Sequence, residues 1–133
     1  MDTPRVLIAD DDAGIREALT DLLTEEGMEV VGAATDGREA VQLVTLTRPD
    51  VVLMDLRMPV MDGITATRHI REEAPLVQVV MLSAYDDPAL THGAEDAGAY
   101  AYLIKGSSAS LVGDVVNQAY SLKKGLEARE RSA

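Results

Sequence analysis

The sequence predicts an α/β fold in which helices cover both faces of a five-stranded parallel sheet. Five short apolar runs alternate with segments whose apolar residues recur at helical spacing. Strands and helices that alternate in this way form parallel sheets with right-handed crossovers. The first, third and fourth runs are the most purely apolar, so we expect them at the centre of the sheet. This predicts the doubly wound strand order 2-1-3-4-5.

The five predicted strands are the runs RVLIA, VVGAA, VVLM, VQVVML and AYLI, at residues 5–9, 30–34, 51–54, 77–82 and 101–104. Between the first two lies a helix whose apolar stripe is Ile15, Ala18, Leu19, Leu22 and Leu23. Gly27 is expected to end that helix, because glycine readily takes the left-handed conformation found after helix C-termini.

The other four helices are predicted mainly from their capping residues. Asp36 caps a helix from 37 to about 47, and a third helix runs from 63 to about 73. Asp87 caps a fourth helix that starts with Pro88, a residue favoured at the first helical position. The last helix starts at about residue 110, and the residues expected to face the core are Leu111, Val115, Ala119 and Leu122.

Composition limits the domain count and the classes of partner. A chain of 133 residues that is 47% hydrophobic fits one domain, at residues 1–122, with 123–133 as the end of the last helix and a linker or tail. The net charge of -11 argues against direct binding to nucleic acid or to anionic membranes by this segment. The absence of cysteine fits a reducing compartment, and neither a signal peptide nor a long apolar span is present, so we expect a cytoplasmic protein.

Polar residues follow four of the predicted strands at the point where each strand ends. They are Asp10 and Asp11 after the first, Asp55 after the third, Ser83 after the fourth and Lys105 after the fifth. The carboxyl ends of parallel strands meet at one edge of the sheet, where open α/β folds bind ligands. Each residue alone is weak evidence, since an Asp after a strand is commonly a helix cap, but their joint placement predicts a site.

The residue types at this edge favour a hard divalent cation. Crowded carboxylates repel one another unless a cation holds them. A few oxygen ligands without His or Cys suit Mg²⁺ better than zinc or a calcium cage. Carboxylate, Mg²⁺, ammonium and hydroxyl together are suited to accepting a phosphoryl group, with Asp55 as the nucleophile.

The segments LIADDDAGIR, VVLMDLRMPVMDG, MLSAY and AYLIKG resemble the receiver domain of bacterial two-component response regulators, which has a CheY-like, flavodoxin-like fold. The resemblance covers about residues 5 to 122. The segments RVLIADD and VVLMDLRMP are most similar to those of the NarL/FixJ subgroup. Many members have proline after the lysine, where this chain has Gly106.

The resemblance implies a role for each residue at the site. Asp55 takes a phosphoryl group from a phosphohistidine on a sensor histidine kinase. Asp11 ligates Mg²⁺ directly, Asp10 acts chiefly through water, and the backbone carbonyl of Arg57 completes the protein ligands. Lys105 binds the phosphoryl group.

The resemblance also implies a switch and an output. Ser83 is the switch hydroxyl, and Tyr102 is the aromatic residue that turns inward on activation, although packing against a helix would explain Tyr102 almost as well. The surface that changes is formed by the fourth helix, the fifth strand and the fifth helix. The receiver promotes its own phosphorylation and dephosphorylation but is not otherwise an enzyme, and it can form a phosphorylation-dependent homodimer.

Two interpretations of the signalling role are compatible with the sequence. The receiver regulates transcription through an output domain absent from this chain, or it acts alone as a phosphotransfer shuttle or adaptor. Two other classes fit less well. Phosphatases of the haloacid-dehalogenase type need a second Asp two residues after the nucleophile, where this chain has Arg57, and cobalamin-binding modules need an Asp-x-His-x-x-Gly loop that the sequence lacks.

Overall fold

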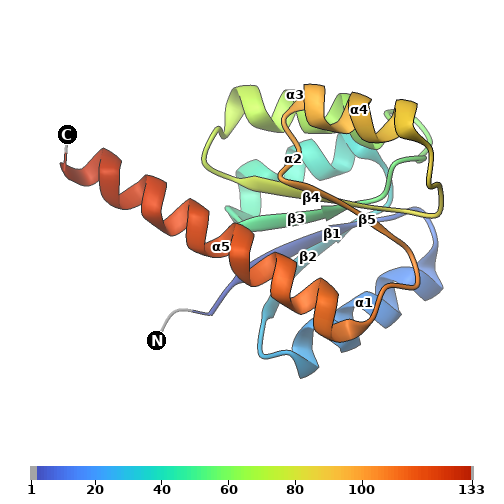
Figure 1. Cartoon of the computed structure of the whole chain (residues 1–133), viewed down its shortest axis with the longest axis horizontal. Coiled ribbons are helices and arrows are strands. Elements are labelled where there is room, and N and C mark those ends of the chain that lie inside the picture. The colour runs from blue at the N-terminus through green and yellow to red at the C-terminus, as the bar shows by residue number, and fades with distance from the viewer. Residues whose placement is uncertain (1–2, 133) are drawn as a thin grey trace.

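The predicted fold and strand order are confirmed by a computed structural model, which describes residues 3–132. Five parallel strands lie in the order β2-β1-β3-β4-β5, with α2, α3 and α4 on one face and α1 and α5 on the other (Figure 1). The elements are β1 (Arg5–Ala9), α1 (Ala13–Glu25), β2 (Glu29–Ala34), α2 (Gly37–Thr47), β3 (Val51–Met54), α3 (Gly63–Glu73), β4 (Gln78–Ser83), α4 (Pro88–Ala97), β5 (Ala101–Ile104) and α5 (Ala109–Ser132).

Two separate hydrophobic cores result from the alternation of side chains along the central strands. Because successive residues of a strand point to opposite faces, β3 sends Val52 and Met54 toward α2, α3 and α4, and Val51 and Leu53 toward α1 and α5. The strands β1 and β4 divide their side chains in the same way. All four residues of β3 are therefore buried, which explains the unbroken apolar run in the sequence.

Aspartate side chains begin the first four helices. Asp12, Asp36 and Asp87 accept hydrogen bonds from backbone N–H groups of the first turns, as the sequence predicted for Asp36 and Asp87, and Asp62 caps α3 in the same way. Gly27 has φ +84° and follows the C-terminus of α1, so its predicted role is also confirmed. These caps satisfy N–H groups that would otherwise lack partners at the helix ends.

The last helix differs from the sequence prediction in its buried face and in its length. Leu111 and Leu122, expected to face the core, are 45% and 42% exposed, while Val112 and Val116 are buried. Ala119 is buried as predicted and Val115 packs partly against the core, so the prediction was wrong at Leu111 and Leu122 and missed Val112 and Val116, which pack beneath β4 and β3. α5 also stays helical to Ser132, so helix fills residues 123–132 of the segment in which the sequence predicted the end of the helix and a linker or tail.

In the part of the chain that the structure describes, no helix has the length and apolar character needed to cross a membrane. The longest, α5, carries charged residues throughout its last turns.

Gly63 brings the start of α3 against the strand end that carries Asp55. Its N–H donates to the carbonyl oxygen of Leu56, and a Cβ at this position would collide with the carbonyl oxygen of Asp55. The loop between β3 and α3 can therefore fold back only if residue 63 has no side chain. Within that loop Val60 has φ +69°, and the N–H of Met61 donates to the carbonyl of Pro59, a tight turn that is strained for a β-branched residue.

We predict that Gly63→Ala lowers the free energy of unfolding by about 2 kcal/mol or more, because the new methyl group forces the backbone apart. Gly125→Ala in α5 is the matched control, since a Cβ there meets no atom within 4 Å. It should raise stability by about 0.5–1 kcal/mol, the gain from replacing a helical glycine. Urea unfolding followed by circular dichroism measures both, and equal shifts in the two variants would contradict the close approach at Gly63.

Candidate functional site

The sheet brings the predicted site residues to one edge through the register of its strands. Ala9 pairs with Met54, so Asp10 and Asp55 leave neighbouring strands side by side, and the N–H of Asp55 donates to the carbonyl of Ala9. Ser83 ends β4, one residue further than the predicted strand, and its carbonyl accepts from the N–H of Lys105.

Three carboxylates form the acidic group at this edge. One oxygen from each of Asp10, Asp11 and Asp55 lies within 4.8 Å of the others. Asp10 and Asp55 are buried at 1% and 8% exposure, whereas Asp11 is exposed. Among residues 3–132 this is the one cluster of acidic or imidazole side chains close enough to share a metal ion. Its donor set is entirely oxygen and opens to solvent through Asp11, which fits a hard, partly hydrated cation such as Mg²⁺.

Lys105 bridges the two buried carboxylates. Its Nζ lies 2.8 Å from Oδ2 of Asp10 and 3.2 Å from Oδ1 of Asp55. Burial alone would lower the pKa of Lys105, but the hydrogen bond to Asp10 and the charges of both carboxylates raise its pKa above the ordinary value. The side chain therefore stays an ammonium ion at the point where two negative charges meet.

The two oxygens of Asp55 differ in their surroundings. Oδ1 accepts the N–H of Leu56 at 2.9 Å and faces Lys105, whereas Oδ2 has no hydrogen-bond partner among the residues that the structure describes. Burial, followed by the charge of Asp10, raises the pKa of Asp55, and Lys105 and the Leu56 N–H only partly oppose this. Oδ2 is therefore the oxygen of Asp55 that can react with or bind another group.

Asp12 and Arg16 hold Asp10 in place without joining the acidic group. The N–H of Asp12 donates to Oδ1 of Asp10, while the Asp12 side chain caps α1 by accepting from the N–H of Ile15. The guanidinium of Arg16 donates to the backbone carbonyl of Asp10 at 2.8 Å. Sequence reasoning missed Arg16, and no motif marks it, because its contact depends on the turn between β1 and α1.

Ser83 and Tyr102 meet at a residue that the sequence did not single out, Tyr85. The buried Ser83 Oγ accepts from the N–H of Tyr85 at 3.1 Å, and the Tyr102 hydroxyl donates to the Tyr85 carbonyl at 2.6 Å. The guanidinium of Arg57 lies 4.7 Å from the centre of the Tyr85 ring. The loop between β4 and α4 is thus tied to the ends of β4, β5 and, through Arg57, to the loop after Asp55.

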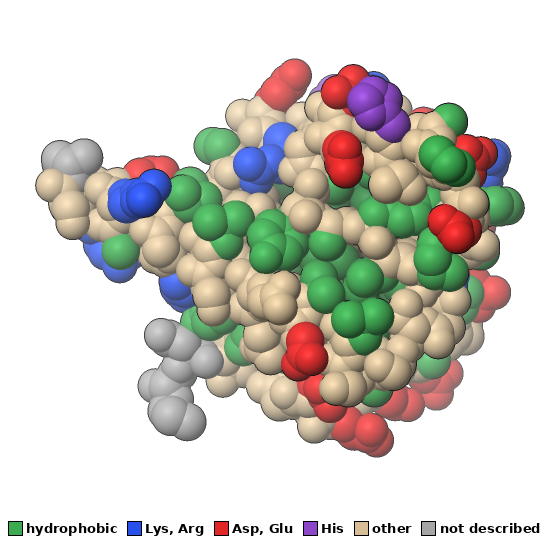
Figure 2. Space-filling model, in the orientation of Figure 1, with side chains coloured by type: hydrophobic (Ala, Val, Ile, Leu, Met, Phe, Trp, Pro, Cys, Tyr) green, Lys and Arg blue, Asp and Glu red, His purple; other side chains and the backbone are tan. Residues whose placement is uncertain are grey.

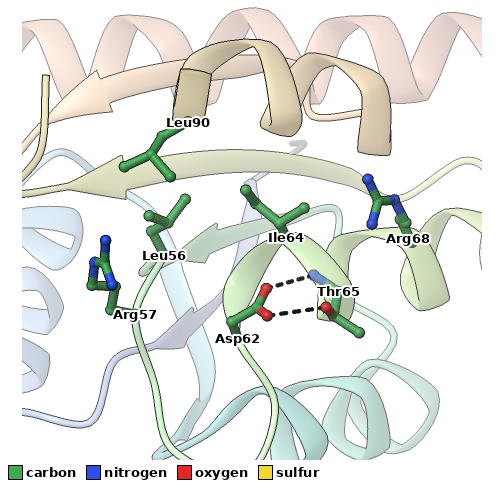
Figure 3. A pocket seen from close by; sticks show the side chains of 7 residues that line it. All are labelled: Leu56, Arg57, Asp62, Ile64, Thr65, Arg68 and Leu90. Atoms are coloured by element: carbon green, nitrogen blue, oxygen red, sulfur yellow. Dashed lines mark hydrogen bonds between the residues drawn. The ribbon is translucent and has the colours of Figure 1, made fainter. Parts of the chain in front are cut away.

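A separate hollow of about 300 Å³ lies between α3 and α4 (Figure 3). Apolar side chains of Leu56, Ile64 and Leu90 line it, with Arg57 and Arg68 at its ends. Its one carboxylate, Asp62, is engaged by the N–H and the hydroxyl of Thr65. None of the acidic group, Ser83 or Lys105 lines this hollow, so it is separate from the site that the sequence predicted at the sheet edge.

We predict that Asp55→Asn raises the free energy of unfolding at neutral pH in the absence of divalent cations. The raised pKa means that folding disfavours the charged carboxylate, so wild type loses stability as the pH rises through the folded-state pKa. The advantage of Asp55→Asn should shrink as the pH falls and should vanish below the ordinary pKa of 3.8, where Asp55 is protonated in both the folded and the unfolded state.

Unfolding curves across this pH range, with EDTA present, test the sign of the effect. Asp12→Asn is the control, because residue 12 is exposed and asparagine caps helices as well as aspartate does. A constant difference between wild type and Asp55→Asn at all pH values would show that the Asp55 pKa is not raised by folding.

Known proteins with the same fold and sequence pattern were found by comparison. The transcriptional regulatory protein PdtaR of Mycobacterium tuberculosis is 49% identical over 106 residues, which are 80% of this chain and 51% of PdtaR. The chain thus spans about half the length of that relative. The chemotaxis protein CheY of Thermotoga maritima is 40% identical over 114 residues, which are 86% of this chain and 95% of CheY.

Solved structures agree with these relatives. A response regulator receiver domain protein from Clostridium thermocellum superposes with a TM-score of 0.86 at 30% identity, covering 92% of this chain and 98% of that one. The receiver domain of the response regulator NarL from Mycobacterium tuberculosis superposes with a TM-score of 0.82 at 35% identity. The match covers 94% of this chain and 99% of that one. Receivers of the NarL/LuxR type are therefore among the structural neighbours, as the sequence resemblance implied. The family model of the response regulator receiver domain matches residues 6–117, and the chain belongs to this family of two-component signalling domains.

Proposed function

We propose that Asp55 is the phosphoryl acceptor and that a sensor histidine kinase is its donor. The observation that carries this proposal is the placement of Asp55, with one unpartnered oxygen, beside two further carboxylates and an ammonium ion at 3.2 Å. Family membership supports it, since receivers take part in two-component systems. The resemblance of the segment around Asp55 to that of receiver domains also supports its assignment as the acceptor.

In the proposed transfer, an oxygen of the Asp55 carboxylate forms a bond to phosphorus as the phosphorus–nitrogen bond of the donor phosphohistidine breaks. The bonding electron pair returns to the imidazole, which takes up a proton from solvent. Loss of the group consumes one water and gives inorganic phosphate and free carboxylate. Lys105 is suited to neutralising the phosphoryl oxygens, because its ammonium already lies between Asp10 and Asp55.

We infer that Asp11 and Asp55, with Asp10 acting chiefly through water and the backbone carbonyl of Arg57, hold Mg²⁺. When bound, the ion would offset the repulsion between the carboxylates and the incoming phosphoryl group. The oxygen-only donor set and the exposure of Asp11 support this choice of metal.

For the output, we propose that Ser83 and Tyr102 transmit the change at Asp55 to the surface formed by α4, β5 and α5. Both side chains bond the backbone of Tyr85, which supports a coupled movement of that loop. Hydrophobic side chains form a band over β5 and α5, below α4, in Figure 2, which suits a partner or a second copy of the receiver. Regulation of transcription through an output domain is favoured by PdtaR, and a stand-alone role by the match to nearly all of CheY.

We predict that incubation with acetyl phosphate and Mg²⁺ adds one phosphoryl group to wild type and none to Asp55→Asn. The adduct is an acyl phosphate, so hydroxylamine should remove it, and intact-protein mass spectrometry measures both steps. An adduct of the same kind on Asp55→Asn would show that another residue is the acceptor.

Metal removal gives a second prediction for the same site. EDTA should stop labelling. Asp11→Ala should weaken Mg²⁺ binding by more than about tenfold, because even the loss of a residue that only hydrogen-bonds to a metal ligand can weaken binding that much. Asp12→Ala should leave Mg²⁺ affinity unchanged, because the Asp12 side chain caps α1 and faces no other carboxylate of the group. Calorimetric titration with Mg²⁺ measures the affinities, and equal losses in the two variants would mean that the metal lies elsewhere.

For the switch, we predict that Ser83→Ala accepts phosphate but responds less on the α4 side. Phosphorylation adds roughly -1.5 to -2 charges and three strong acceptors, which can draw the Ser83 hydroxyl away from the Tyr85 N–H. Amide hydrogen exchange over residues 88–111, with and without beryllofluoride, measures the response. Equal changes in wild type and Ser83→Ala would show that the hydroxyl does not carry the signal.

A further inference from the structure

The strand β3 has a buried aspartate at each end. Asp55 follows β3 at the sheet edge that carries the acidic group. Asp50 precedes β3 at the opposite edge of the sheet and is 5% exposed. The backbone of Asp50 continues the sheet on both sides, since its N–H donates to the carbonyl of Arg5 and its carbonyl accepts from the N–H of Gln78. Asp50 is therefore fixed to the centre of the sheet.

Both oxygens of the Asp50 side chain are occupied. Oδ2 accepts from the N–H of Arg5 at 2.9 Å, and Oδ1 lies 2.8 Å from Nζ of Lys123, which comes from α5. The side chains of Lys123 and Asp50 are 13% and 6% exposed, so solvent screens this ion pair little. The next residue, Lys124, is 42% exposed and forms an ion pair only with Glu127 of the same helix among the described residues.

Among the described residues, the Asp50–Lys123 ion pair is the last ion pair that joins α5 to the rest of the protein. Val112, Val116 and Ala119 pack into the core, and the C-terminal part of α5 projects away from the sheet (Figure 1). Residues 124–132 extend for roughly 13 Å at 1.5 Å per residue. The hydrogen bonds and ion pairs that the structure gives for the side chains of residues 124–132 stay within α5 or reach back to Lys123.

We infer that the ion pair between Asp50 and Lys123 fixes the direction of the projecting end of α5 relative to β3, the strand that carries Asp55. If α5 swung away, Asp50 would remain buried without its cation, which is a costly state. A partner or segment held by the projecting end would thereby keep one orientation relative to the acceptor. This inference does not depend on phosphorylation of Asp55, because the pair forms between residues remote from the acidic group.

Spin labels test the inference directly, because the chain has no cysteine of its own. Glu17→Cys on α1 and Ala128→Cys on the projecting end place labels at two exposed positions. Gly125→Ala is added to every sample, so that bending at this glycine does not contribute. Double electron–electron resonance then gives the distribution of distances between the labels.

We expect one narrow distance peak for the reference protein and for Lys124→Met, the matched control. Lys123→Met should lose that peak in favour of a broad distribution. Because Lys123→Met leaves a buried carboxylate unpaired, the double variant Asp50→Asn/Lys123→Met is measured as well, and it should also lose the peak while remaining folded. A narrow peak retained in the double variant, or equal broadening in Lys124→Met, would overturn the inference.

Labelling of the same samples with acetyl phosphate separates this inference from the proposed function. Lys123→Met should be labelled to the same extent as the reference protein, because the acidic group lies at the other end of β3. If Lys123→Met lost both the labelling and the narrow distance peak, the Asp50–Lys123 ion pair would hold the whole fold and not the direction of α5 alone. That result would overturn the inference. Failure to label even the reference protein would count against the proposed function alone, since the distances do not depend on it.

Discussion

The contact of one ammonium ion with two buried carboxylates is the interaction on which this site depends. Asp10 and Asp55 end neighbouring central strands, and two like charges at that spacing would repel each other in a region with little solvent. Lys105, at the end of β5, reaches both across the end of β4. The parallel sheet supplies this arrangement, because only parallel strands bring all their carboxyl ends to one edge.

That same interaction leaves the site incompletely neutralised. One positive charge cannot offset Asp10, Asp11 and Asp55 together, and the pKa of Asp55 stays raised by burial and by Asp10 in spite of Lys105. A fold selected for stability alone would place an amide or an apolar side chain at residue 55. Natural proteins accept such local costs at functional sites, so the unfavourable setting of Asp55 is itself an argument for a role in chemistry.

The fold and the acidic group could be predicted because they follow from patterns that act along the chain. The all-apolar run before Asp55 identifies a strand buried on both faces, and the strand ends then place Asp10, Ser83 and Lys105 at one edge without any knowledge of contacts. The buried face of α5 was predicted correctly at Ala119 but not at its start, because Leu111 and Val112 are both apolar and only the packing against the sheet selects between them.

Contacts that depend on loop geometry could not be predicted. Tyr85 links Ser83 to Tyr102 through its backbone N–H and carbonyl, and any residue at position 85 except proline could offer both groups. Its ring does add a contact, to Arg57, but nothing in the sequence relates these two loops. The left-handed conformation of Val60 is unexpected for the same reason, since a β-branched residue disfavours it and only the surrounding loop imposes it.

The two ends of β3 show how one strand can serve both structure and chemistry. Asp50 and Asp55 are buried carboxylates that flank the same four-residue strand, yet both oxygens of Asp50 have donors while Oδ2 of Asp55 has none among the described residues. A saturated carboxylate holds its neighbours in place, and one with a free oxygen can bind or react. Because the strand between them is buried on both faces and paired on both sides, it has little freedom to bend. The Asp55 end and the Asp50 end of β3 therefore belong to one rigid element.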